Sequence, residues 1–198
     1  MLLFDKLERL GLRLVLASQS PRRRQLMEGS HLPCDVVCYN VDESYPAELL
    51  PEEVPEYLAK LKGSHYPVEL TEHEILITAD TIVICDGRIL GKPRDRDDAH
   101  AMLGEISGRQ HKVITGVALR SMNKSVSFSV QSAVHFAPLT SEEIEFYIEQ
   151  YSPLDKAGSY GIQEWIGYIG IERIEGSFYN VMGLPIQRLY TELKNFIE

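Results

Sequence analysis

The chain has 198 residues and 44% of them are apolar, so it is long enough to bury the core of one ordinary domain. Its formal charge of -9 at pH 7 argues against a broad binding surface for nucleic acid or anionic lipid, because such surfaces need clustered Lys and Arg. We therefore expect neither a nucleic-acid nor a membrane partner, and an anionic substrate would need a local basic pocket.

Three cysteines, Cys34, Cys38 and Cys85, show none of the paired spacing that is typical of zinc sites or disulfide frameworks. This usage favours a reducing compartment. The N-terminal apolar stretch is interrupted by charges, unlike the uninterrupted apolar region of a signal peptide, and no apolar run approaches membrane-spanning length. The sequence thus predicts a cytoplasmic protein.

The first half of the chain alternates helical and strand patterns. Apolar residues recur at helical spacing at the N-terminus, and two short apolar runs read as strands, each followed by a helix. A longer run rich in β-branched residues is too apolar for an exposed edge, which predicts a central strand. The predicted elements are helices over 2–10, 22–28 and 51–63, the last ending at Gly63, and strands over 12–17, 34–39 and 75–84.

The second half predicts a hairpin and four further helical or strand segments. Asn123 and Lys124 separate two alternating segments, which is typical of an antiparallel pair. Thr140 and Glu143 have the spacing of a capping box at a helix start. The predictions are a helix over 97–106, strands over 113–120, 126–136 and 165–174, a helix after Thr140, and a helix over 185–197. Their order predicts one α/β domain with a mixed sheet.

The segment Ser18-Gln-Ser-Pro-Arg-Arg-Arg24 joins a predicted strand to a predicted helix. A helix N-terminus is already positive, so three arginines in its first turn are unfavourable unless an anion binds beside them. Free backbone N–H groups, together with the Ser18 and Ser20 hydroxyls, are a common arrangement around a phosphate. A solvated basic turn explains the same residues, and composition alone does not separate the two interpretations.

Asp80 interrupts the apolar central strand. An unpaired carboxylate there would cost several kcal/mol, so it should contact a metal, a cation or a water molecule that it activates. The alternative is a carboxylate that is paired for purely structural reasons. Both interpretations predict a partner for Asp80.

Further charged residues lie at separated points along the chain. Asp42 and Glu43 follow the second predicted strand, and three lysines, Lys62, Lys92 and Lys156, lie in or near predicted loops. Carboxylates that hold a hard divalent cation, with lysines that neutralise phosphate oxygens, are the usual arrangement for phosphoanhydride chemistry. Each residue by itself is more often a solvated surface charge.

A Ser/His/Asp hydrolase can also be drawn from Ser18 or Ser20, His111 and Asp80. No G-x-S-x-G sequence supports it. His111 lies just before an apolar strand, where a lone histidine is more often a hydrogen-bonded structural residue than a ligand. We leave His111 out of the predicted catalytic set.

Five motifs resemble the Maf family of nucleotide pyrophosphatases and occur in that family's order: Leu16-Ala-Ser-Gln-Ser-Pro-Arg-Arg23, Ala79-Asp-Thr81, Gly91-Lys-Pro93, Asp155-Lys-Ala-Gly158 and Gly183-Leu-Pro185. The resemblance runs from about Leu12 to the C-terminus. It predicts one domain over 12–198, with residues 1–11 as a helical extension. The implied fold is α/β, with a mixed central sheet flanked by helices and two lobes around an active-site cleft, as in inosine triphosphatases.

The resemblance implies hydrolysis of a nucleoside triphosphate, the predicted partner, between its α- and β-phosphates. Asp80 would be the catalytic acidic residue that accepts a proton from water. Glu43 and Asp80 would bind a divalent metal, Mg²⁺ or Mn²⁺. The predicted phosphate-binding residues are Ser18, Arg23, Lys62, Lys92 and Lys156. Family members are often dimers, so a homodimer is a further expectation.

Substrate choice in the family follows three positions, which here are Arg22, Thr81 and Gln163. The run Tyr160-Gly-Ile-Gln163 resembles the subgroup that acts on dTTP and UTP, and Glu164 follows it where many relatives have glycine. A member that prefers purine nucleotides or 7-methyl-GTP, and a non-catalytic nucleotide-binding regulator of cell division, remain the alternatives.

Overall fold

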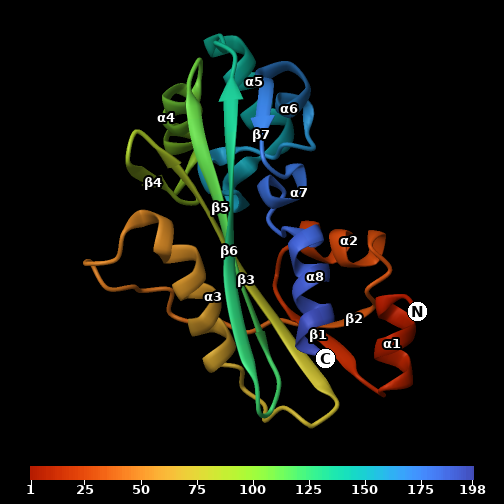
Figure 1. Ribbon diagram of the computed structural model, residues 1–198. Coiled ribbons are helices and arrows are strands. Elements are labelled where there is room, and N and C mark those ends of the chain that lie inside the picture. The colour runs from red at the N-terminus through yellow and green to blue at the C-terminus, as the bar shows by residue number, and fades with distance from the viewer. The chain divides into compact units, whose positions relative to one another are not determined.

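The protein, seen in a computed structural model that describes residues 1–198, has a mixed sheet flanked by helices (Figure 1). The strand order is β2-β1-β3-β5-β6-β7, and β4 pairs with β3. The strands are β1 Arg13–Ala17, β2 Cys34–Val37, β3 Glu74–Cys85, β4 Arg88–Leu90, β5 Gln110–Arg120, β6 Ser125–Phe136 and β7 Ile171–Glu175. The predicted α/β class with a mixed sheet is confirmed.

Eight α-helices accompany the sheet, and short 3-10 turns precede α3 and follow α5. The helices are α1 Leu3–Arg9, α2 Pro21–Gly29, α3 Val54–Ser64, α4 Arg96–Ile106, α5 Ser141–Tyr151, α6 Trp165–Gly170, α7 Phe178–Val181 and α8 Ile186–Phe196. No helix is long and apolar enough to cross a membrane.

The chain divides into two compact units. Unit 1 comprises 1–80, 115–130 and 183–198, and unit 2 comprises 81–114 and 131–182. Strands β3, β5 and β6 each contribute residues to both units. The predicted division into an extension over 1–11 and one domain over 12–198 stays a prediction, as does the predicted cleft.

Unit 1 is built on three parallel strands, because β1 pairs in parallel with both β2 and β3. The four residues Leu14 to Ala17 of β1 are buried, as the apolar run of that strand predicts. Helix α1 buries Leu3 and Leu7 and lies against α8 (Figure 1). Lys6 and Glu198 form an ion pair of 3.3 Å between the two ends of the chain.

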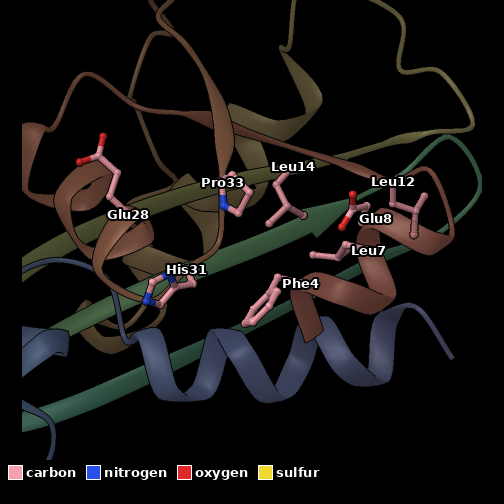
Figure 2. A pocket seen from close by; sticks show the side chains of 8 residues that line it. All are labelled: Phe4, Leu7, Glu8, Leu12, Leu14, Glu28, His31 and Pro33. Atoms are coloured by element: carbon pink, nitrogen blue, oxygen red, sulfur yellow. The ribbon is translucent and has the colours of Figure 1, made fainter. Parts of the chain in front are cut away.

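A pocket of about 650 Å³ lies in unit 1 between α1 and the segment after α2 (Figure 2). Its lining is mostly apolar and includes no residue of the predicted active site. The lining residues are Phe4, Leu7, Glu8, Leu12, Leu14, Glu28, His31 and Pro33.

Helix α3 is anchored on the sheet through short polar contacts and one close backbone approach. The Thr78 hydroxyl on β3 donates a 2.6 Å hydrogen bond to the Ala59 carbonyl, and Arg120 on β5 donates one of 2.7 Å to the Gly63 carbonyl. The helix continues one residue past Gly63 to Ser64, so the predicted end at Gly63 is wrong by one residue. These contacts fix the helix that carries Lys62.

Gly116 on β5 allows the start of α3 to approach the sheet. A Cβ atom there would lie 2.2 Å from the Pro55 carbonyl carbon and 2.3 Å from the Glu56 nitrogen. We expect Gly116→Ala to destabilise the protein by about 3 kcal/mol, because backbone on both sides resists movement. Urea unfolding followed by circular dichroism measures this. Gly104→Ala is the control, since a Cβ on that helical residue would meet nothing within 4 Å; equal stabilities would contradict the prediction.

Unit 2 contains the hairpin from β3 to β4, helices α4 to α7 and strand β7. Asp86 and Gly87 form the turn after β3, both with positive φ, as the Asp-Gly pair predicts. Thr140 caps α5 through a complete capping box with Glu143. Helix α4 contacts α5 and the 3-10 turn Ala157–Ser159.

The predicted strand over 165–174 is wrong in its first half. Residues Trp165 to Gly170 form helix α6, and only Ile171–Glu175 is a strand, paired antiparallel with β6. Tertiary packing overrides the strand preference of the aromatic and β-branched residues. Gly167 lies so close to the Ile162 carbonyl that a Cβ would be 1.8 Å from its oxygen, a contact that the alternating pattern does not reveal.

Candidate active site

Lys62 lies between two carboxylates in unit 1. Its Nζ is 2.6 Å from Oδ1 of Asp80 and 3.0 Å from Oε1 of Glu43. Side-chain exposure is 17% for Lys62, 11% for Asp80 and 53% for Glu43, so the ion pair with Asp80 is largely shielded from water. The predicted partner of Asp80 is therefore a lysine from α3. This hydrogen bond engages Oδ1 of Asp80 and does not involve Oδ2.

The predicted phosphate loop is organised around Arg23. Arg23 Nε donates to the Gly183 carbonyl at 2.7 Å, and Nη1 donates to the Ala79 carbonyl at 2.8 Å. A longer contact of 3.4 Å joins Nη1 to Oγ of Ser18, whose hydroxyl also accepts the Ser20 N–H at 3.1 Å. The guanidinium is thus fixed beside the residue that precedes Asp80 in β3.

Local electrostatics act on Arg23 in opposite directions. Burial lowers the pKa of its guanidinium from the ordinary value, and the neighbouring Arg22 acts in the same direction. The Asp80 and Glu43 carboxylates oppose this shift of the Arg23 pKa. An incoming anion would favour the charged form in the same way, which suits a phosphate contact.

The three arginines of the loop differ in their environments. Ser20 caps α2, with its hydroxyl accepting the Arg23 N–H at 3.4 Å, and Pro21 occupies the first turn, where its missing N–H is tolerated. Arg22 and Arg23 are half-buried, whereas Arg24 is exposed. A solvated basic turn describes Arg24 only.

Unit 1 therefore brings together five of the predicted site residues, Ser18, Arg23, Glu43, Lys62 and Asp80. Arg22 belongs to the same unit. Thr81 follows Asp80 in β3, is half-buried, and begins the part of the strand that belongs to unit 2. Unit 2 also carries Lys92, Lys156 and Gln163.

Lys156 and Lys92 have contrasting surroundings in unit 2. Lys156 is buried, with its Nζ 2.8 Å from Oδ1 of Asp155 and 3.2 Å from Oε1 of Glu164. Lys92 is exposed in the loop after β4, close to Gly91, whose carbonyl accepts the Gly158 N–H at 3.0 Å. Lys92 is thus open to a phosphate, while Lys156 is already neutralised by protein carboxylates.

Gln163 lies in a tight turn of unit 2. The Glu164 N–H donates to the Gly161 carbonyl at 3.0 Å, so Ile162 and Gln163 are the two central residues of the turn. Oε1 of Gln163 is buried and accepts no hydrogen bond from the protein. A buried acceptor without a donor costs about 1–3 kcal/mol, so this atom favours a ligand that supplies a donor.

His111 has the structural role that its sequence position predicts. It is buried, its Nε2 lies 2.7 Å from the Tyr160 hydroxyl, and its ring packs edge-on against Tyr160. Burial lowers its pKa to about 4, with a smaller contribution from His135. The Ser/His/Asp interpretation needs this imidazole beside a serine hydroxyl, but the Tyr160 hydroxyl occupies Nε2.

The lowered pKa of His111 makes stability depend on pH. The folded state keeps the imidazole neutral to about pH 4, while the unfolded chain binds the proton near pH 6.5. The unfolded state therefore gains protons first, and we expect the free energy of unfolding to fall by about 3 kcal/mol between pH 6.5 and pH 4. Urea unfolding at several pH values measures this. A His111→Gln variant should lose this part of the slope and exposed His73→Gln should keep it; equal slopes in all three proteins would contradict the assignment.

Glu43 and Asp80 are the residues in this cluster that could hold a divalent metal. No group of three or more His, Cys, Asp or Glu side chains is placed to bind an ion by itself. Two carboxylates fit Mg²⁺ or Mn²⁺ nonetheless, because such ions commonly take one or two carboxylates and complete their shell with water and substrate phosphates. Their shared contact with Lys62 shows that this position already attracts a cation.

Several groups that build the site carry no signal of their own in the sequence. The Tyr39 hydroxyl donates a 2.5 Å hydrogen bond to the Lys62 carbonyl, which fixes the end of α3. The carbonyls of Ala79 and Gly183 hold Arg23. The motif Gly183-Leu-Pro185 could have indicated Gly183, but backbone carbonyls have no residue-type signature.

Known proteins resemble this chain over nearly its whole length. The family model for Maf-like proteins matches residues 13–196. A dTTP/UTP pyrophosphatase of Parabacteroides distasonis is 54% identical over 93% of this chain and 96% of its own length. One of Porphyromonas gingivalis is 53% identical over 94% and 95%, and one of Flavobacterium psychrophilum is 44% identical over 92% and 94%.

A likeness of fold extends to the Ham1 protein of Staphylococcus aureus. Its structure matches with a TM-score of 0.53 and 15% sequence identity, over 93% of this chain and 99% of that one. The family model covers nearly the whole chain, and the two most identical of these relatives match more than nine tenths of it at about half identity. The chain therefore belongs to the Maf family.

Proposed function

We propose that this protein is a nucleoside triphosphate diphosphatase that hydrolyses dTTP and UTP between the α- and β-phosphates, giving the monophosphate and pyrophosphate. The observation that carries the proposal is the cluster in which Lys62 contacts both Asp80 and Glu43, beside the fixed guanidinium of Arg23. The curated relatives named as dTTP/UTP pyrophosphatases support the substrate class.

Asp80 is the general base in this proposal. Lys62 holds Oδ1, which orients the carboxylate and leaves Oδ2 to accept a proton from the attacking water. Arg23, Lys62 and Lys92 neutralise phosphate oxygens as negative charge moves toward the leaving pyrophosphate. Ser18 supplies a hydroxyl at the same loop. Lys156 joins the phosphate-binding set only if its pairing with Asp155 or Glu164 loosens.

A divalent metal completes the proposed site. Glu43 and Asp80 would hold Mg²⁺ or Mn²⁺, which supplies charge neutralisation and a Lewis acid for the phosphates when it is bound. Lys62 balances the same two carboxylates in the protein alone. The metal and the Lys62 ammonium would therefore both neutralise the carboxylates of Glu43 and Asp80.

The pyrimidine preference rests on Gln163. Uracil and thymine carry an N–H donor between two carbonyls, which complements an amide that accepts through Oε1 and donates through Nε2. The buried Oε1 of Gln163 has no donor from the protein and suits that N–H. Cytosine has an acceptor nitrogen at the same place and would leave Oε1 without a partner. Arg22 and Thr81 remain further proposed selectivity residues.

Incubation with a panel of nucleoside triphosphates and Mg²⁺ or Mn²⁺ tests the proposal. Pyrophosphate and orthophosphate are measured separately, with purine nucleotides and 7-methyl-GTP in the panel. We expect pyrophosphate release, fastest with dTTP and UTP and dependent on metal. Orthophosphate as the only inorganic product would overturn cleavage between the α- and β-phosphates, and no turnover of any nucleotide would favour a binding regulator.

The proposal also includes the cellular location, the partners and the oligomeric state of the protein. A cytoplasmic location is expected because nucleoside triphosphates are made and used there, and three free thiols suit a reducing compartment. We expect the nucleotide as partner, with no nucleic acid and no membrane, and a homodimer as the oligomeric state. Sedimentation of the purified protein tests the last point.

A further inference from the structure

Tyr147 and Glu164 lie at the two ends of the turn that presents Gln163. The Tyr147 hydroxyl accepts the Gly161 N–H at 2.9 Å and donates to Oε2 of Glu164. One phenol therefore joins the first and last residues of the turn Gly161–Glu164. The hydroxyl reaches this place from α5, where the Tyr147 side chain is fully buried.

Burial and close packing hold the hydrogen bond between Tyr147 and Glu164 in place. Burial raises the pKa of Tyr147, and its hydrogen bond to Glu164 raises it further, so the phenol stays protonated and acts as a donor. The Glu164 carboxylate packs over Gly161 so closely that a Cβ there would lie 2.7 Å from Cδ of Glu164. Any side chain at position 161 would displace the carboxylate from the turn.

Glu164 also connects the turn with Lys156. While Oε2 of Glu164 accepts from Tyr147, Oε1 lies 3.2 Å from Nζ of Lys156. The Glu164 carbonyl accepts the Gly167 N–H at 2.9 Å, which fixes the start of α6. Both side-chain oxygens and the backbone carbonyl of Glu164 are thus engaged within unit 2.

We propose that Tyr147 and Glu164 form a clamp that positions Gln163 for base selection, with Glu164 as a positioning residue. The inference rests on the proposed function and deepens it. A glutamine amide discriminates between bases only when its orientation is fixed, because a mobile amide can rotate to satisfy either hydrogen-bond pattern. Residues that hold the backbone of Gln163 therefore set the selectivity between uracil and cytosine without contacting the base.

Two variants separate the contacts of the clamp. Tyr147→Phe removes the hydroxyl and both of its hydrogen bonds while retaining the ring. Glu164→Gln retains the length of the side chain and an oxygen acceptor but loses the ion pair with Lys156. Tyr151→Phe and Glu149→Gln are matched controls, because they make the same changes at exposed positions of α5.

The primary measurement is the ratio of kcat/KM for UTP to kcat/KM for CTP. We expect the ratio to fall about tenfold in Tyr147→Phe and about threefold in Glu164→Gln, and to stay within about twofold in both controls. Loss of folded protein lowers both rate constants by the same factor and leaves the ratio unchanged. A merely structural role of the two residues would therefore not change this ratio.

Trp165, the only tryptophan of the chain, supplies a readout independent of turnover. It follows Glu164 directly, and its ring packs edge-on against Phe146 with 4.8 Å between centroids. Titration with uridine 5′-monophosphate should change its fluorescence, and the Kd should rise about tenfold in Tyr147→Phe. An unchanged UTP to CTP ratio and an unchanged Kd in both variants would overturn the clamp.

These experiments distinguish failure of the proposed function from failure of the clamp. A wild-type protein that hydrolyses no nucleoside triphosphate refutes the proposed function, while the titration with uridine 5′-monophosphate still tests whether the clamp affects nucleotide binding. A wild-type protein that hydrolyses UTP, together with variants of unchanged selectivity, refutes the clamp alone. Retained selectivity in Tyr147→Phe with loss in Glu164→Gln would also refute it, since the hydroxyl then has no role.

Discussion

An Asp80→Asn variant is expected to lose about 10²–10⁴-fold in kcat for UTP hydrolysis, because an amide cannot accept the proton of the attacking water. The fold should persist, since the amide oxygen can still accept the hydrogen bond that Lys62 donates at 2.6 Å. Pyrophosphate release under saturating nucleotide and Mg²⁺ measures kcat. Thermal unfolding measures whether the protein is intact.

Asp86→Asn is the matched control for this experiment. Asp86 follows the same strand, is exposed, pairs with Arg109 and has a positive φ that asparagine tolerates. We expect its activity to match that of the wild type. Pyrophosphate release by Asp80→Asn at a rate close to the wild type would remove Asp80 from the role of general base, whatever the effect on binding.

A Lys62→Met variant is expected to lower kcat/KM by about 10²–10³-fold. Methionine retains much of the apolar stem but removes the ammonium that neutralises phosphate and orients Asp80. We expect kcat to fall by a larger factor than KM rises. The reason is that the phosphate charge that Lys62 stabilises grows toward the transition state. Steady-state kinetics with UTP measure both constants.

The neighbouring Lys60 provides the matched control for this prediction. Lys60 is two residues away on α3 and points to solvent, where it pairs with Glu56 at 3.6 Å. Lys60→Met removes the same charge from the same helix, so we expect near wild-type kinetics. Equal losses in the two variants would attribute the effect to net charge and not to the contact with Asp80 and Glu43.

Much of the fold could be predicted from the sequence because local signals and burial agree. The apolar run of β1, Pro21 in the first turn of α2 and the capping box of α5 each indicate the element that the structure contains. The strand prediction was wrong for residues 165–170 because their conformation depends on Gly167 approaching the Ile162 carbonyl, a contact between backbone groups. Periodicity reports only where side chains point.

The candidate site divides in a similar way. Charged residues in unusual settings, such as Asp80 within an apolar strand, carry a physical signal that predicts a partner. The identity of the cation that pairs with Asp80 could not be deduced from composition. It is Lys62 because contacts of α3 with Thr78 and Gly116 fix the position of that helix on the sheet. The contact of Lys156 with Glu164 could not be predicted either, since the two residues are eight positions apart in the chain and a turn lies between them.

The discontinuous make-up of unit 1 has a consequence for biosynthesis. Its last segment, 183–198, is translated after the whole of unit 2. Arg23 leaves the ribosome before any residue of unit 2, yet the Gly183 carbonyl that holds its Nε emerges some 160 positions later. Nascent chains should therefore carry an unformed phosphate loop until Gly183 has emerged, and a premature stop before Gly183 would release a polypeptide whose Arg23 has no such anchor.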